Sequence, residues 1–157
     1  MSDFFSKTDL SRKDAENIIS ETLNRCDDGE LYLENSKSES IMLDDNKIKN
    51  SSYSSDLGYG LRAVTGEIVA YSHSNEISKN SLKQSANNLN STLKSKKGIY
   101  NHEISKTNKK FYEDVNPIDE KSLSSKLELL KEVNNYTRAK GGIVQQVTAS
   151  FAGEHKS

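Results

Sequence analysis

Residues 28–74 read DGELYLENSKSESIMLDDNKIKNSSYSSDLGYGLRAVTGEIVAYSHS. Four segments rich in Leu, Ile, Val and Tyr alternate here with three groups of turn-forming residues, at 44–46, 54–56 and 65–66. Asp, Asn and Ser favour turns because their side chains bond to the nearby backbone, and Gly because it accepts positive φ. The stretch therefore predicts an antiparallel meander of about four strands.

Helical patterns flank this meander. Before it, Ser11 and Asp14 resemble a capping box, and a stripe of apolar residues and one threonine follows with helical spacing at 15, 18, 19, 22, 23 and 26. Cys26 lies on this stripe, which favours a buried structural thiol. After the meander, a second helix is expected with the stripe Leu82, Ala86, Leu89 and Leu93, capped by Ser74, Asn75 or Ser78. A third helix is expected to begin with Asp119 as its cap and to carry Leu123, Leu127, Leu130, Val133 and Tyr136.

The order of these patterns predicts an α+β fold in which the helices pack on one face of the sheet. Residues 1–97 would form helix, sheet and helix, residues 98–118 a polar surface connection, and residues 119–140 a helix that completes the domain. Residues 141–157 would supply a terminal strand from Ile143 to Ala152, without a hairpin partner, which we interpret as the first strand of a truncated central domain.

Composition narrows the function classes. The chain has 157 residues and a net charge of −1, so no overall electrostatic field favours binding to nucleic acid or to an anionic membrane. The first residues lack the long apolar core of a secretory signal, and no window approaches the length of a membrane span. A single cysteine fits a reducing compartment, so a cytoplasmic location is expected.

The sequence contains no recognisable catalytic constellation. The three histidines, His73, His102 and His155, are far apart and do not have the spacing of a helical zinc site. The acidic pairs at 27–28, 44–45 and 113–114 coincide with turns or loops, where Asp commonly bonds to the backbone. We therefore assign no catalytic, cofactor-binding or metal-binding residue in this chain.

Three residues in the strands combine polar reach with small neighbours, which suits contact with a peptide. They are Tyr59, Arg62 and His73. The alternative is that Arg62 and His73 are ordinary side chains on the wet face of a sheet.

Several segments carry a family resemblance in register: DGELYLENSKSES, SSYSSDLGYGLRAVTGE, AYSHSNEIS, YEDVNPID and VQQVTASFAGE. Together they resemble the amino-terminal domain of the TldD branch of the TldD/PmbA metallopeptidases. The resemblance implies a cytoplasmic zinc enzyme that cleaves small or unfolded polypeptides as a heterodimer with a TldE/PmbA-like paralogue. The HExxxH zinc motif of the family is absent from this sequence, so the resemblance transfers no catalytic residue and leaves zinc to the full-length protein.

Two hypotheses follow. In the first, the chain is the amino-terminal part of a TldD-like subunit and contributes to assembly and substrate enclosure, but not to cleavage. In the second, it is a stand-alone module that captures an extended peptide at an exposed sheet edge. The second rests on the polar stretch 35–40 and on the expected terminal strand.

Overall fold

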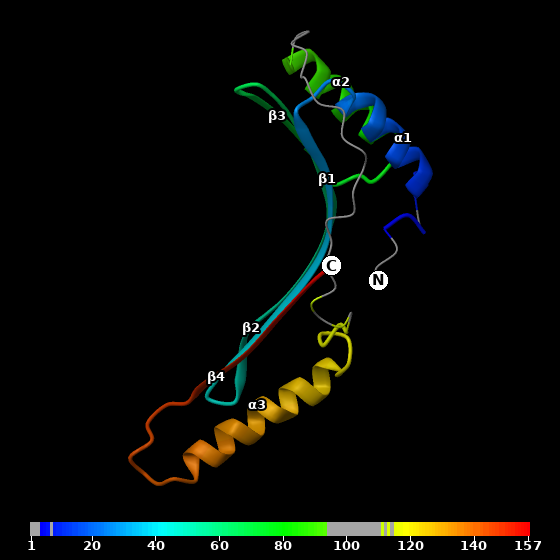
Figure 1. Ribbon diagram of the computed structural model, residues 1–157. Helices are drawn as coiled ribbons and strands as arrows, with labels where there is room; N and C mark the ends of the chain where they lie inside the picture. Colours follow the sequence, from blue (N-terminus) through cyan, green and yellow to red (C-terminus); the bar gives the residue numbers. More distant parts are fainter. Residues whose placement is uncertain (1–3, 7, 94–110, 112, 114) are drawn as a thin grey trace. The chain divides into compact units, whose positions relative to one another are not determined.

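The computed structural model describes residues 4–6, 8–93, 111, 113 and 115–157. It contains a four-stranded sheet in the order β3-β2-β1-β4 and three helices (Figure 1). In chain order the elements are α1 (Arg12–Leu23), β1 (Asp28–Asp44), β2 (Lys47–Thr65), β3 (Ile68–Ser74), α2 (Lys79–Leu93), α3 (Leu123–Arg138) and β4 (Thr148–Lys156). The predicted α+β class with an antiparallel sheet is confirmed.

The strands are divided differently from the prediction. Asp45 and Asn46 adopt positive φ values of 47° and 67°, and Gly66 adopts 60°, so turns form at two of the three expected places. At residues 54–56 the chain stays extended, and β2 runs through them without interruption. The predicted turn there is wrong because Ser and Asp also tolerate extended backbone, and this site lacks the Gly or Asn that would enforce positive φ.

The chain divides into two compact units, which we describe separately. The first unit comprises Met1–Asn35 and Asp56–Glu113, and the second comprises Ser36–Ser55 and Asp114–Ser157. Both β1 and β2 contribute residues to each unit. Most of the expected connection at residues 98–118 lies outside the described residues, and so does His102. The expected domain boundaries stay a prediction.

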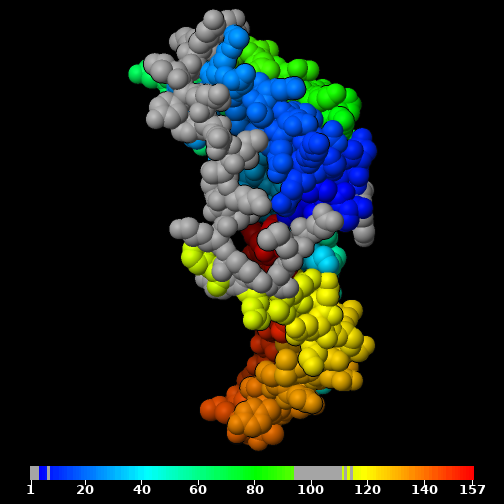
Figure 2. All heavy atoms as spheres, turned by 45° about the vertical axis from the view of Figure 1, so that its right-hand side comes forward, coloured from blue at the N-terminus to red at the C-terminus, as the bar shows by residue number. Residues whose placement is uncertain are grey.

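The first unit has a core between its sheet and two helices. α1 packs against α2, and α2 packs against β3, with both helices on one side of the strands (Figure 1). Figure 2 shows the atoms of α1 in blue beside those of α2 in green. Ser11 caps α1 by accepting a hydrogen bond from Asp14 N at 3.1 Å, as the capping pattern predicted. Cys26 and the predicted stripe of α2 are buried, and Ser78 caps α2 by accepting a hydrogen bond from Ser81 N.

The second unit packs α3 on β1 and β4 through a small apolar cluster. Its buried members are Ile41, Leu43, Leu130 and Ala149. The predicted cap of α3 is wrong: Ser122 accepts the hydrogen bond from Ser125 N. Asp119 instead accepts hydrogen bonds from Lys37 Nζ and Asn116 Nδ2, both at 2.6 Å, so its carboxylate is engaged elsewhere.

The predicted buried stripe of α3 is also largely wrong. The helix buries Lys126, Leu130 and Asn134, whereas four of its apolar side chains are exposed: Leu123, Leu129, Val133 and Tyr136. Its orientation follows from Lys126, whose ammonium group bonds to Glu39 and to the carbonyl of Ile118 on the sheet side of the helix.

The terminal strand has a partner. β4 begins at Thr148, five residues later than expected, and pairs antiparallel with β1 from Ser36↔Lys156 to Asp44↔Thr148. The two segments on which the edge hypothesis rested, 35–40 and the terminal strand, therefore largely bond to each other. That basis for the hypothesis is corrected here, and the assignment of residues 141–157 to a further domain stays a prediction.

Candidate functional site

Tyr59 is a core residue of the first unit. Only 4% of it is exposed, and its Oη lies 2.9 Å from both Ser81 Oγ and Ser85 Oγ on α2. Ser85 Oγ also accepts a hydrogen bond from Ser72 on β3. A buried tyrosine usually finds a partner for its hydroxyl, and here the partners link the helix to the sheet. The side chain thus anchors α2 and is directed away from solvent.

Arg62 lies on the opposite face of β2, where it forms two ion pairs. Its Nη2 is 2.6 Å from Asp28 Oδ2 and its Nε is 2.9 Å from Glu30 Oε1, both on β1. These carboxylates, Glu30 first and then Asp28, raise the pKa of the guanidinium above its usual value. Arg62 is therefore a cation already matched by two anions, which leaves little net charge to attract an anionic ligand.

His73 is exposed on the same face of the sheet as Arg62. Its ring stacks on Tyr71, with ring centroids 5.8 Å apart and an interplanar angle of 27°. The register pairs Gly60 with His73 and Arg62 with Tyr71. A Cβ added at Gly60 would lie 2.6 Å from Tyr71 Oη, so the tyrosine ring covers the glycine. An aromatic side chain over a strand glycine is a device that stabilises sheets.

The structure thus separates the three residues chosen from the sequence. Arg62 and His73 share one face of the sheet, and Tyr59 points into the core on the other. The shared face also exposes Tyr32, Val69 and Tyr71, between 58% and 65% exposed. Peptide contact by Arg62 and His73 stays a prediction, since their observed partners are neighbouring side chains.

The family resemblance implies zinc in the full-length protein, but the described residues do not form a site for it. Among them, no group of three His, Cys, Asp or Glu side chains converges in a way that could hold a metal ion. The donor set does not fit a zinc site, because structural and catalytic zinc require at least three protein ligands.

No helix in the described part of the chain has the length and apolar character that a membrane span requires.

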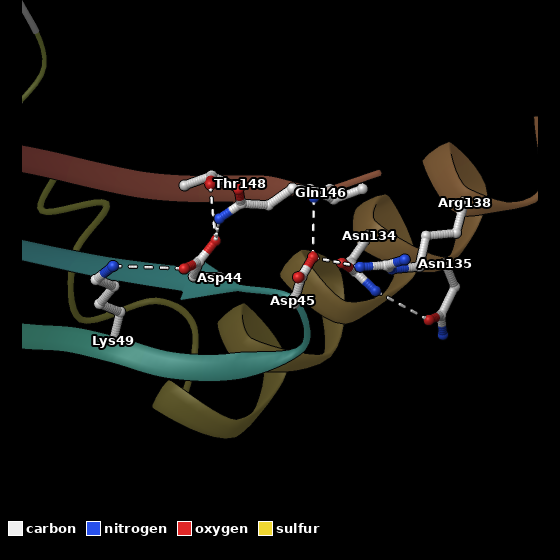
Figure 3. Close-up of polar contacts among 9 residues, drawn as sticks. Asp44, Asp45, Lys49, Asn134, Asn135, Arg138, Gln146 and Thr148 are labelled. Carbon is white, nitrogen blue, oxygen red and sulfur yellow. Dashed lines mark hydrogen bonds and ion pairs between the residues drawn. The ribbon is translucent and has the colours of Figure 1, made fainter. Parts of the chain in front are cut away.

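A polar cluster at the β1–β2 turn organises the second unit (Figure 3). Asp44 Oδ1 accepts hydrogen bonds from Gln146 Nε2 at 2.7 Å and Thr148 Oγ1 at 3.0 Å, and Lys49 Nζ lies 3.4 Å from Asp44 Oδ2. Gln146, then Thr148, and more weakly Lys49 lower the pKa of the Asp44 carboxyl group. Asp44 therefore binds the residues at the start of β4.

Asp45 extends this cluster to α3. Its Oδ1 accepts a hydrogen bond from Val147 N at 2.9 Å and forms an ion pair with Arg138 in the last turn of α3 (Figure 3). The sequence correctly assigned residues 44–46 to a turn, but the partners lie about a hundred positions further along the chain. Local turn propensity contains no information about such distant partners.

A second cluster that the sequence did not reveal is the buried pair Lys126–Glu39. Lys126 Nζ lies 2.5 Å from Glu39 Oε1 and 2.7 Å from the carbonyl oxygen of Ile118, and the two side chains are 6% and 11% exposed. The ammonium group also lies 5.7 Å from the centre of the Phe151 ring. The only sequence signal was that Lys126 lies four residues before Leu130, on the same side of the helix. A lysine at such a position is easily mistaken for a solvated side chain.

Comparison with known proteins identifies relatives for most of the chain. Residues 29–91 match the family described as PmbA/TldA metallopeptidase domain 1. A protein named metalloprotease TldD homolog from Buchnera aphidicola (subspecies Acyrthosiphon pisum, strain APS) is 34% identical over 131 residues, covering 83% of this chain and 27% of the relative. The protein of the same name from Haemophilus influenzae is 32% identical over 133 residues, covering 83% and 28%. The chain spans little more than a quarter of the length of these relatives.

Two crystal structures share the fold. One, from Bacteroides thetaiotaomicron, carries the description of a modulator of DNA gyrase and superposes with a TM-score of 0.59 at 18% identity, covering 91% of this chain and 37% of that protein. The other is TldE from Thermococcus kodakarensis, with a TM-score of 0.58 at 14% identity and coverage of 92% and 33%. At these identities the likeness concerns the fold alone.

Proposed function

This chain belongs to the PmbA/TldD metallopeptidase family, and from that membership we propose that it acts as the amino-terminal portion of a TldD-like zinc metallopeptidase subunit. In this role it supplies scaffold and assembly surface in the cytoplasm, and the zinc ligands and catalytic groups lie in the remainder of the full-length subunit. The substrate class is polypeptide, and neither nucleic acid nor a membrane takes part.

One observation carries this proposal. It is the identity of about one third, sustained over 131 residues, with relatives named metalloprotease TldD homolog. A scaffold role is supported by what the residues of the two units do. Tyr59 joins a helix to the sheet, Asp44 and Asp45 hold the start of β4, and Lys126 orients α3.

The proposed partner is a TldE/PmbA-like paralogue. The fold shared with TldE supports this pairing, because paralogous subunits of one fold commonly assemble through pseudo-symmetric interfaces. The experiment mixes the tagged 157-residue chain with the paralogue from the same source and measures complex formation by size-exclusion chromatography with light scattering. A one-to-one complex is expected. Absence of a complex with a folded chain would contradict an assembly role.

A second candidate function is capture of an extended segment at a sheet edge, and it is favoured by a specific part of β2. The pairing with β3 covers only residues 59–65 of β2, whereas residues 47–57 are exposed. Backbone groups on a sheet edge can bind an added strand. A direct peptide titration distinguishes this function from a purely structural role.

A further inference from the structure

One open edge of the sheet lies in the second unit, at residues 47–53 of β2. In the sheet order β3-β2-β1-β4, β2 has β1 on one side and β3 on the other, and β3 pairs only with residues 59–65. In the described part of the chain, no strand pairs with residues 47–53 on the side away from β1. All seven residues are exposed, including Ile48 at 56% and Tyr53 at 58%. At about 3.3 Å per residue, the edge is roughly 23 Å long, enough for a typical strand.

The charge of this edge has a single sign. Residues 47–53 read KIKNSSY, with Lys47 and Lys49 and no Asp or Glu. The Lys49 side chain is 65% exposed and forms an ion pair with Asp44 at 3.4 Å, and Asp44 also accepts hydrogen bonds from Gln146 and Thr148. Lys47 and Lys49 therefore give this stretch a net positive charge, beside backbone groups that pair with no second strand in the described part of the chain.

This charge argues against a second copy of the chain as the occupant. Two such edges pairing with each other would bring together four lysines without an acidic residue in either strand. Lysine on an edge strand is a recognised device that opposes self-pairing. An acidic partner would meet no such repulsion.

The other end of the sheet differs in charge. β4 reads TASFAGEHK from Thr148 to Lys156, and Glu154 pairs with Lys156 at 3.2 Å. Its charges are of both signs and partly matched within the strand. Compared with β4, residues 47–53 therefore have the clearer preference for the charge of a ligand.

We propose that residues 47–53 of β2 bind an extended polypeptide segment that carries acidic side chains, by adding it to the sheet as a further strand. The inference rests on the second candidate function and defines its ligand class. Backbone hydrogen bonds would hold the segment, and Lys47 and Lys49 would select glutamate or aspartate on it. Ile48 and Tyr53 would contribute apolar contacts across the new strand pair.

The test measures fluorescence anisotropy of labelled peptides of about nine residues added to the full 157-residue chain. Three peptides alternate Thr with Glu, Gln or Lys, and a fourth is the Glu peptide N-methylated at alternate residues. The Glu peptide is expected to bind at least about tenfold more tightly than the Lys peptide at low salt, and N-methylation is expected to abolish binding.

Variants assign the site. Lys47→Glu with Lys49→Glu is expected to weaken binding of the Glu peptide by about tenfold or more and to strengthen binding of the Lys peptide. Lys121→Glu with Lys131→Glu makes the same charge change at exposed positions outside the edge and is expected to leave binding within about twofold. Lys47→Gln with Lys49→Gln provides a milder version, and circular dichroism checks that each variant is folded.

The outcomes separate the two levels of the proposal. Equal binding of the Glu, Gln and Lys peptides would overturn acid selectivity but leave edge capture intact. Equal effects of the two Lys→Glu pairs would place the site elsewhere and overturn the assignment. Binding of no peptide would overturn edge capture itself. Edge capture would also be overturned if the chain self-associates and the double variant Lys47→Glu with Lys49→Glu changes that self-association.

Discussion

Lys126 is a charged residue in a position that normally selects an apolar one. Its ammonium group is matched by Glu39 and the carbonyl of Ile118, and it lies 5.7 Å from the centre of the Phe151 ring. A buried ion pair often adds little net stability compared with an apolar pair, because desolvating both charges is costly. Its effect here is on orientation, since it fixes which face of α3 meets the sheet.

Replacing Lys126 alone is therefore expected to be costly. Lys126→Met leaves Glu39 buried without its cation and should lower the free energy of unfolding by about 3–5 kcal/mol, measured by urea denaturation. The double variant Lys126→Met with Glu39→Leu should recover most of this loss. Lys131→Met, at an exposed position of the same helix, should change stability by no more than about 0.5 kcal/mol. Equal effects of the two single variants would contradict this account.

Asp14 makes the stability of the fold depend on pH in the acidic range. Lys79, followed by Ser11, lowers its pKa from 3.8 to about 2. Since the folded pKa lies below the unfolded one, ionised Asp14 stabilises the fold above about pH 4, and the contribution is lost as the pH falls towards 2.

The variant Asp14→Asn tests this dependence, because asparagine does not titrate. Urea denaturation between pH 5 and pH 2 should show a shallower loss of stability for the variant than for the original chain. Glu16→Gln, at an exposed position of the same helix, is the control. An unchanged pH profile for Asp14→Asn would show that the Lys79 pair does not persist in solution.

At the scale of elements, the close approach of α1 to β1 depends on a glycine. A Cβ added at Gly29 would lie 2.6 Å from Leu23 Cδ2 and 2.8 Å from the carbonyl oxygen of Arg62. The carbonyl belongs to the backbone and cannot move aside easily. Gly29→Ala should therefore lower the free energy of unfolding by about 1–3 kcal/mol, although alanine is otherwise the less costly residue in regular structure.

The control for this change is Gly142→Ala. Nothing lies within 4 Å of a Cβ added at Gly142, so its substitution should be nearly neutral in the same thermal or urea denaturation. A Gly29→Ala variant as stable as Gly142→Ala would contradict the packing described for α1 and β1.

The elements show what the sequence could predict and why. The sequence correctly predicted α1 and α2, including their buried stripes, because the local spacing and the caps agreed with the packing. α3 was correctly expected, but its cap and buried face were not. Asp119 pairs with Lys37, and Lys126 with Glu39, both more than eighty positions away. Local patterns contain no information about such contacts.

The same limit applies to the strands and the candidate residues. The positive φ of Asp45 and Asn46 follows from their residue types, whereas β2 passes through 54–56 extended because nothing there enforces a turn. The alternation of side chains along β2 places Tyr59 and Arg62 on opposite faces. It could not indicate that Tyr59 would bond to two serines of α2, or that Asp28 and Glu30 would surround Arg62.

At the scale of the whole molecule, the relatives of the chain are named for an enzymatic activity, whereas the described residues of the chain contribute structure. The relatives are named metalloproteases, and this chain spans little more than a quarter of their length. Its described residues do not bring together three groups that could hold a metal ion. The proposed function gives this chain a role in structure and assembly, and it leaves the chemistry to the rest of a TldD-like subunit.

The most direct test of that claim measures zinc and peptidase activity in the same preparation of the 157-residue chain. Zinc content is determined by atomic emission after dialysis, and cleavage is followed with an unfolded, fluorescently quenched polypeptide, with and without a chelator. Far less than one zinc per chain and no chelator-sensitive cleavage are expected. One zinc per chain together with cleavage that the chelator abolishes would contradict that claim.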